Sequence, residues 1–445
     1  MIKKIHFFIE YTVHYAKKYF WAIFLGLAVG SLIFINRNHI SDVYQSFQVD
    51  HRHFGIEGLY TTQSLPPTIL NQISYGFTIA SENNKPELSP IISNLTISED
   101  HRHYYFNFQD NLQWHNGLKF DTNDIHLNLS GAQIIPKSKT QLEIALDNPY
   151  SPLLSLLTKP IFYKNTLVGL GSFESGKITY RDGYLKTLTL TNQKNHRQKI
   201  TYHFYQNSQN LINAFKLGEV DQIITDTFEE KLSQWPNVKI SPQISTTQYL
   251  AIFFNTTKLS SKQLRQAIAY ATPKTIDKND RCLGPISTNS WAYNSDIKEY
   301  NYNPDRAKEL IVNNEISHLN LIVGDRKLLS LAEEIKTAWE QNLHLQVTVN
   351  ANSDQINLSD YDAILTYGVI PDDPDQYSFW HSTQTATNIT HLNNSRIDKL
   401  LEEGRQIFDQ QERKKIYYDF QRFLLEESPA IFLKFPTTYN ISRVK

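Results

Sequence analysis

The alternation of apolar and polar residues predicts a buried strand followed by an acidic turn in residues 360–380. Positions 361, 363, 365 and 367 form one face of a strand that ends at Gly368. A turn rich in aspartate and proline follows, and then the aromatic residues Tyr377, Phe379 and Trp380. Open α/β sheets build ligand sites where buried strands deliver polar side chains at their carboxyl ends. We therefore expect two lobes arranged around this turn.

Periodicity elsewhere predicts an α/β chain whose second half is the more helical. The first half contains a hairpin over 88–108 and a helix over 210–217 that Gly218 ends, with a buried strand at 220–224 behind it. Further helices and strands follow, the helices expected at 261–271, 303–311, 328–340 and 394–427 and the strands at 319–323, 345–349 and 430–433. Because no Gly/Ser-rich linker separates the two halves, we expect strands to cross between the lobes.

Residues 19–35 form an uncharged apolar run near the N-terminus. At about 1.5 Å per residue, a helix of this length nearly crosses a hydrocarbon core of about 30 Å. Four lysines precede the run and Arg37 follows it, so the positive-inside rule predicts a single-pass protein of the cell membrane. Residues 1–18 would be cytoplasmic, 19–36 the transmembrane anchor, and the remainder extracellular or periplasmic. A cleaved signal peptide is the alternative, although no small-residue cleavage site follows the run.

Composition narrows the classes of function. The chain has 445 residues, more than one ordinary core fills, so two or three domains are expected. Lys plus Arg number 44 and Asp plus Glu number 45, which leaves no basic excess to bind nucleic acid. Cys282 is the only cysteine, so the chain can form neither an internal disulfide nor a Cys-rich metal site.

The histidines and the search for catalytic motifs add little to these conclusions about function. Asp-His-Arg-His occurs at 50–53 and again at 100–103, with His115 nearby in sequence. Two histidines two apart on a strand share a face and could ligate a metal or a metal complex. The sequence holds no Gly-x-Ser-x-Gly, no His-Glu-x-x-His and no phosphate-binding glycine loop. We expect neither an enzyme nor a cofactor.

Six segments, taken in order, resemble the extracellular solute-binding proteins of peptide and nickel ABC importers (family 5). They include the turn at Trp114-His115-Asn116-Gly117 and the Gly218-Glu219-Val220-Asp221 step after a helix, and they lie at 94–125, 168–173, 210–223, 253–271, 302–311 and 393–433. The resemblance implies an α/β, two-lobed periplasmic-binding-protein type II fold, a hinged clamshell. Lobe I would comprise 37–252 together with 431–445, and lobe II 253–430. The family's helical insertion after Ile125 is missing, so a small outer subdomain is expected.

The resemblance also implies where ligand would bind. In peptide-binding members, an aspartate after the tryptophan of a Gly-Trp step pairs with the peptide's α-ammonium group. Alignment on Asp373-Pro374 puts Tyr367 at the tryptophan position and Ile370 at the aspartate position, and Asp372 could supply the carboxylate instead. The candidate ligand-binding residues are Tyr367, Gly368, Val369, Ile370, Asp372, Asp373 and Trp380. A solvated turn is the alternative for the aspartates, and core packing is the alternative for Tyr367 and Trp380.

The resemblance implies a function as well. The chain would be the substrate-binding component of an ABC-type peptide importer that captures a peptide-like solute between its lobes. It would deliver that solute to permease subunits in the membrane. The missing carboxylate and the small subdomain favour an alternative, a membrane-anchored sensor or scaffold that reuses a solute-binding domain. A nickel- or haem-complex binder is the third interpretation, based on the histidine pairs.

Overall fold

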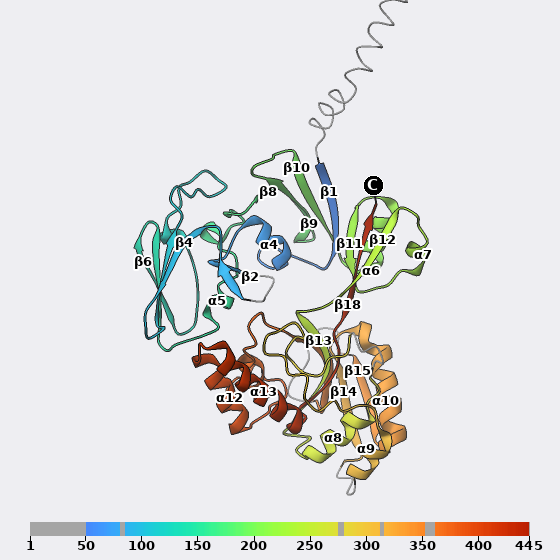
Figure 1. Ribbon diagram of the computed structural model, residues 1–445. Coiled ribbons are helices and arrows are strands. Elements are labelled where there is room, and N and C mark those ends of the chain that lie inside the picture. The colour runs from blue at the N-terminus through green and yellow to red at the C-terminus, as the bar shows by residue number, and fades with distance from the viewer. Residues whose placement is uncertain (1–49, 81–84, 275–279, 312–315, 352–360, 445) are drawn as a thin grey trace, which may run out of the picture.

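The computed structural model describes residues 50–80, 85–274, 280–311, 316–351 and 361–444. They form two lobes, one of which carries an outer subdomain (Figure 1). The cytoplasmic segment and the membrane anchor expected at 1–18 and 19–36 lie outside the described residues. Across the ranges that are described, no helix combines the length and apolar character needed to span a bilayer.

Lobe I is built on a seven-stranded mixed sheet. Its strands, in spatial order, are β12 (Val238–Ile244), β18 (Thr437–Arg443), β11 (Gln222–Thr225), β1 (Asp50–Glu57), β10 (Gln198–Tyr205), β9 (Tyr184–Asn192) and β8 (Phe173–Arg181). One face packs on α6 (Ser208–Leu217), and the short helices α4 (Pro67–Ile73) and α7 (Glu230–Ser233) complete the lobe. The expected helix and its glycine end are confirmed: Asn207 caps α6 by accepting from the Asn210 backbone N–H, and Gly218 adopts φ 78°.

The outer subdomain of lobe I has a core of its own. A four-stranded antiparallel sheet comprises β4 (Ile92–Ile97), β5 (His103–Phe108), β7 (Gln141–Leu146) and β6 (Ala132–Ser138). The short strands β2 (Thr78–Ala80) and β3 (Pro86–Leu88) and the single turns η1 (Thr122–Asp124), α5 (Leu153–Leu156) and η2 (Tyr163–Asn165) complete it. The hairpin expected over 88–108 is confirmed, because β4 and β5 pair antiparallel; alternate residues of β5 are buried.

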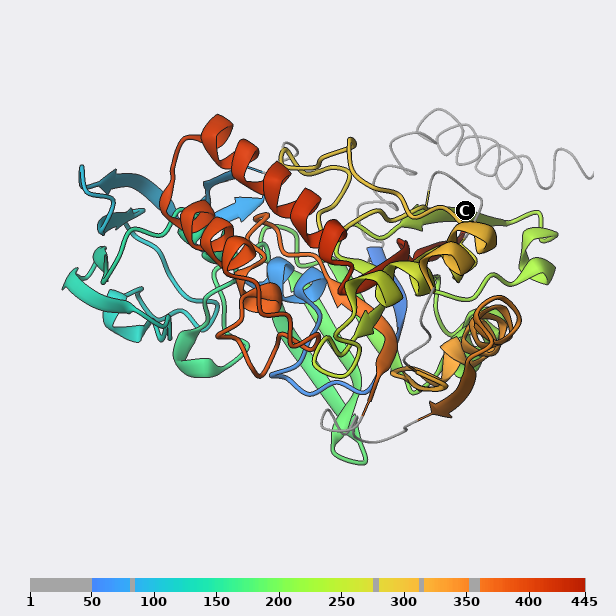
Figure 2. The same ribbon diagram turned by 90° about the horizontal axis from the view of Figure 1, so that it is seen from below.

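Lobe II is built on a five-stranded sheet and carries most of the helices. The strand order is β15 (Gln346–Ala351), β14 (His318–Val323), β16 (Ala363–Val369), β13 (Gln248–Phe254) and β17 (Ala430–Lys434). Its helical elements are α8 (Lys262–Ala271), α9 (Pro304–Leu310), η3 (Arg326–Leu328), α10 (Leu329–Leu343), α11 (Tyr377–Trp380), α12 (Ser395–Gln406) and α13 (Gln410–Glu427). In both views α10 lies at the end of the molecule away from the outer subdomain, and α12 and α13 lie beside that subdomain (Figures 1 and 2).

The helical stretch expected over 394–427 is two helices. The chain leaves helical geometry after Gln406, and Ile407 is extended. Asp409 then caps α13 by accepting a hydrogen bond from the Glu412 backbone N–H at 2.9 Å. An aspartate that bonds its own neighbouring backbone favours a new helix start over continuation of the old helix.

Two short segments that join strands of the two sheets connect the lobes, as expected from the absence of a linker. The chain passes from β12 to β13 through 245–247, and back from β17 to β18 through 435–436. The two crossings are joined by a hydrogen bond from the Ser245 N–H to the Pro436 carbonyl, at 2.8 Å.

The boundaries expected at 252/253 and 430/431 fall inside strands of lobe II. Residues 248–254 and 430–434 pair with each other in the five-stranded sheet, where their apolar side chains are buried. The return to lobe I expected at 431 comes at Thr437, where β18 begins to pair with β12 and β11. We therefore propose lobe boundaries at the crossing segments.

Candidate functional site

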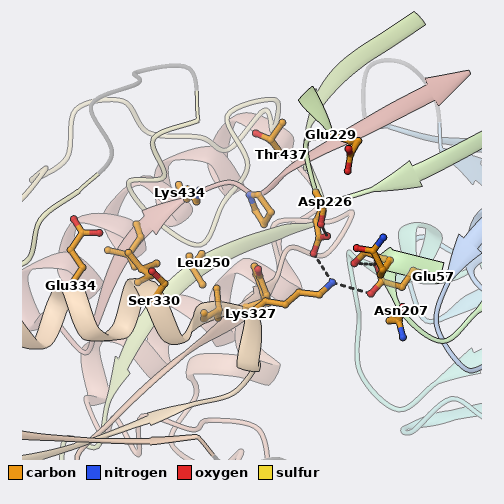
Figure 3. A pocket seen from close by; sticks show the side chains of 18 of the residues that line it. Glu57, Asn207, Asp226, Glu229, Leu250, Lys327, Ser330, Glu334, Lys434 and Thr437 are labelled. Carbon is orange, nitrogen blue, oxygen red and sulfur yellow. Dashed lines mark hydrogen bonds and ion pairs between the residues drawn. The ribbon is translucent and has the colours of Figure 1, made fainter. Parts of the chain in front are cut away.

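A cavity of about 1160 Å³ lies between the two lobes (Figure 3). Lobe I contributes the end of β1, the start of α6 and the segment after β11. Lobe II contributes η3, α10 and residues near the ends of β13, β16 and β17. The crossing segment between β17 and β18 closes one side. The residues used below are Glu57, Asp226, Lys274, Lys327, Tyr367 and Lys434. The walls of the cavity therefore belong to two lobes, between which the chain passes at the two crossing segments.

Tyr367, near the end of the expected strand, is the candidate ligand-binding residue that lines this cavity. It is half-buried near the end of β16, where it pairs with Leu250 of β13. Burial and the nearby carboxylates of Asp325 and Asp226 raise the pKa of its hydroxyl above the ordinary value. The phenol is thus neutral at physiological pH, and it can donate a hydrogen bond or stack against a ligand.

One wall of the cavity is charged, and its residues come from both lobes. Lys327 Nζ lies 3.0 Å from Glu57 Oε1 and 2.8 Å from Asp226 Oδ2 (Figure 3). Burial works against the ammonium charge, but the hydrogen bonds to Asp226 and Glu57 outweigh it and raise the pKa of Lys327. The ammonium group of Lys327 therefore remains charged across neutral pH.

Lys274 also lines the cavity, and its pKa is shifted in the opposite direction from that of Lys327. Its Nζ donates to the carbonyls of Ala269 and Thr272, at 2.5 and 3.1 Å. Burial, and then the neighbouring charge of Arg281, lower the pKa of the amine to about 7. Near neutral pH this lysine therefore exists in both protonation states, unlike Lys327.

The acidic turn itself mostly braces the fold. Asp373 accepts two hydrogen bonds from Arg413 of α13, at 2.7 and 3.1 Å, and both side chains are largely buried. Asp375 pairs with Arg405 of α12, with Nε 2.9 Å from Oδ2. The bidentate pair of Asp373 with Arg413 fixes geometry as well as charge. These pairs hold the turn against α12 and α13. Asp373, a candidate ligand-binding residue, is therefore paired with Arg413.

The remaining candidate residues are dispersed. Trp380 is 1% exposed and packs in the core of lobe II, 6.1 Å from the Phe253 ring centroid. Val369 is exposed at the end of β16. Ile370 is buried and, with the exposed Asp372, lines a separate cavity of about 160 Å³. The turn thus supplies residues to two cavities instead of one.

Gly368 lies where a side chain would collide with the core. A Cβ at this position would overlap the ring of Tyr249, which is 2% exposed and lies 5.3 Å from the Phe432 ring centroid. We expect Gly368→Ala to lower the free energy of unfolding by about 1–3 kcal/mol, because overpacking forces the buried ring aside. Urea unfolding monitored by circular dichroism measures the change.

Gly284→Ala is the matched control for that substitution. A Cβ on Gly284 would make an ordinary contact of 3.8 Å with Ile297. Its effect on the free energy of unfolding should stay within about 0.5 kcal/mol, as for substitutions away from special backbone or packing features. Equal losses in the two variants would show that the contact with Tyr249 has no special weight.

At the other end of the cleft, the outer subdomain contacts the helix pair of lobe II. The Ser151 N–H donates to the Arg405 carbonyl at 2.7 Å, and Tyr150 donates to Asp375 at 3.3 Å. The His101 ring stacks on Phe408, with ring centroids 3.8 Å apart. A cavity of about 700 Å³ lies beside these contacts. The lobes therefore touch at both ends of the cleft, through ion pairs at one and mainly neutral contacts at the other.

The histidine motifs do not form one site. His51 and His53 share a face of β1, with ring centroids 4.4 Å apart, and His53 Nδ1 lies 3.0 Å from His203 Nε2. His101 is in a turn with φ 53°, whereas His103 bonds Glu143 at 2.7 Å, so these two do not share a strand face. In the portion of the chain with described coordinates, no set of three or more His, Cys, Asp or Glu residues is arranged to hold a metal ion.

Sequence reasoning did not identify the charged wall of the cavity. Glu57, Asp226 and Lys327 are separated by more than 100 positions from one another. The order of the strands in the sheet could have indicated two of these residues. Glu57 ends β1 and Asp226 follows β11, and these strands are parallel neighbours. Carboxyl ends of parallel strands meet at one edge of a sheet and commonly form ligand sites.

Comparison with known proteins agrees with this architecture. The profile described as bacterial extracellular solute-binding proteins, family 5 Middle, matches residues 89–391. Among curated proteins, the oligopeptide-binding protein AppA of Bacillus subtilis is 21% identical over 284 residues, 54% of this chain and 51% of that protein. The chain spans about half the length of the curated relatives it matches.

Solved structures share the fold over most of the chain. NikZ from Campylobacter jejuni, in complex with Ni(L-His), has a TM-score of 0.74 at 20% identity and covers 89% of this chain and 94% of that one. AppA from Bacillus subtilis, in complex with a nonapeptide, has a TM-score of 0.71 at 16% identity and covers 89% and 95%. These likenesses show a mixed α/β, two-lobed periplasmic-binding-protein fold. With a family profile that matches most of its length, the chain belongs to family 5 of the bacterial extracellular solute-binding proteins.

Proposed function

We propose that this protein is the substrate-binding component of an ABC-type importer and captures a peptide-like solute between its lobes. The observation that carries the proposal is the cavity of about 1160 Å³ between two lobes that the chain connects through two crossing segments. This volume exceeds the range of about 300–1,000 Å³ typical of small-molecule pockets. Closure of the lobes on the solute would create the form that a membrane permease recognises.

The chemistry of the walls suits a peptide. Tyr367 offers an aromatic face and a neutral hydroxyl, and charged groups of both signs line the remainder. Ile370 leaves no carboxylate at the position where peptide-binding relatives are expected to bind an α-ammonium group. We therefore propose that affinity comes from main-chain hydrogen bonds and from Tyr367 more than from one charge pair. Contacts of Gly368, Val369, Ile370 and Asp372 with solute stay predictions.

Membrane attachment is the second part of the proposal. An anchor at 19–36 would keep the cleft on the outer side, beside the permease. Protease added to spheroplasts, in which any outer membrane has been opened, should digest the lobes while sparing the segment at 1–18. Protection of the lobes in spheroplasts would contradict this orientation.

Native mass spectrometry of the purified full chain tests the ligand class. We expect a co-purifying solute with the mass of a short peptide, released when the protein is unfolded. A bound nickel complex or haem would instead support the third interpretation. Absence of any solute, together with failure to bind peptide pools and to copurify with permease subunits, would favour the sensor or scaffold.

Tyr367→Ala should weaken binding of the recovered peptide by about tenfold or more. Aromatic anchors in the centre of an interface commonly contribute more than about 1.4 kcal/mol, which is a factor of ten in Kd. Isothermal titration calorimetry measures the affinity. Tyr180→Ala is the control, because Tyr180 is 57% exposed on β8 and is absent from the cavity lining. An unchanged Kd for Tyr367→Ala would place the peptide elsewhere.

A further inference from the structure

The ion pairs of Lys327 join the two lobes at the charged wall of the cavity. Lys327 belongs to η3 of lobe II, whereas Glu57 and Asp226 belong to lobe I. One ammonium group contacts both carboxylates, at 3.0 and 2.8 Å (Figure 3). These contacts lie on the side of the cleft opposite the outer subdomain, where α10 forms the wall. They are positioned to resist separation of the lobes.

Local hydrogen bonds within each lobe orient the two carboxylates and the start of η3. Ser208 donates to Glu57 Oε2 at 2.9 Å, and Thr227 donates to Asp226 Oδ1 at 3.1 Å. The Lys327 backbone N–H donates to the Asp325 carboxylate at 2.9 Å, which fixes the start of η3. Groups that are already oriented lose less conformational entropy when they pair. The carboxylates thus form a prepared acceptor for a cation from the opposite lobe.

We propose that Lys327 is an ionic latch that holds the lobes together in the absence of solute. The mechanism is direct: its ammonium pairs with Glu57 and Asp226 only when η3 approaches lobe I. The three side chains are 44%, 24% and 39% exposed, so each pair is individually weak. Two such pairs together change the ratio of closed to open molecules by about three- to tenfold.

The contacts at the other end of the cleft differ from the ion pairs of Lys327 in their dependence on salt. There the lobes meet through the Ser151–Arg405 backbone hydrogen bond and the His101–Phe408 stack, which do not depend on formal charge pairs. Salt shortens the Debye length from about 10 Å at 0.1 M to about 3 Å at 1 M. Raising the salt concentration should therefore loosen the side of the cleft at Lys327 and leave the side at Ser151 in contact.

Double electron–electron resonance measures the opening on the full chain, which is first unfolded and refolded to remove any co-purified solute. Spin labels go on Leu217→Cys in lobe I and Gln341→Cys in α10 of lobe II, both at exposed positions. The native Cys282 is 0% exposed and stays unlabelled. We expect Lys327→Met to shift the distance distribution to longer values, with the closed-to-open ratio reduced about three- to tenfold. Added salt should act on the parent in the same direction.

Charge reversal and a matched control complete the test. Lys327→Glu should open the cleft further, and adding Asp226→Lys to it should restore short distances. Lys415→Met removes an exposed pair with Glu412, 2.8 Å long and within α13, and should leave the distribution unchanged. Distributions for Lys327→Met and Lys327→Glu that match the parent would overturn the proposal. So would a parent distribution that does not respond to salt, a readout that requires no variant to fold.

Discussion

Replacing Arg413 with alanine is expected to lower the free energy of unfolding by about 3–5 kcal/mol. The guanidinium donates to both carboxylate oxygens of Asp373, and the two side chains are 7% and 11% exposed. Burial opposes the charge of Arg413, but the hydrogen bonds and charge of Asp373 outweigh it and raise the pKa of the guanidinium. Removing the cation leaves a buried carboxylate with no partner of opposite charge at this position, which is more costly than losing the pair as a whole.

Urea unfolding of the parent and the variant measures this loss. Lys415→Met is the control on the same helix: its exposed pair with Glu412 should contribute less than about 1 kcal/mol. The double variant Asp373→Asn, Arg413→Met should recover part of the loss, because neither charge then remains buried. A loss for Arg413→Ala no larger than that of the control would show that the pair does not brace the turn.

Trp380→Ala is expected to destabilise the protein by about 3–5 kcal/mol, while solute affinity per folded molecule stays unchanged. The indole is 1% exposed, lies near the rings of Phe253 and Phe432, and donates to Gln376 Oε1 at 3.3 Å. Its removal leaves a cavity in the core of lobe II. The same side chain was a candidate ligand contact from sequence, so the two measurements separate the two roles.

Thermal unfolding and calorimetric titration with the recovered peptide provide those measurements. Tyr180→Ala serves again as the control, because an exposed ring on β8 should change neither quantity by much. Loss of affinity without loss of stability in Trp380→Ala would assign Trp380 to the ligand and contradict its place in the core.

The sequence was sufficient for elements whose causes are local. Asn207 and Gly218 bound α6 through bonds to their own backbone neighbours, and Ser261 caps α8 in the same way. The hairpin expected over 88–108 is present as the antiparallel pair β4 and β5. Such signals act within a few residues, where the chain's own spacing fixes the geometry. They were enough to predict individual helices and strands of an α/β chain, whereas the two-lobed arrangement was expected from the acidic turn and from the resemblance to family 5.

Only the tertiary structure decided which residues share a site. An aspartate in an acidic turn looks the same whether it faces solvent, a ligand or a buried arginine; Asp373 is committed to Arg413 because α13 packs over the turn. The charged wall of the cleft likewise depends on pairing. Glu57 and Asp226 become neighbours because β1 and β11 lie in register, and Lys327 reaches them because the crossing segments set the approach of the lobes. Those contacts arise from long-range packing, which no local pattern in the chain encodes.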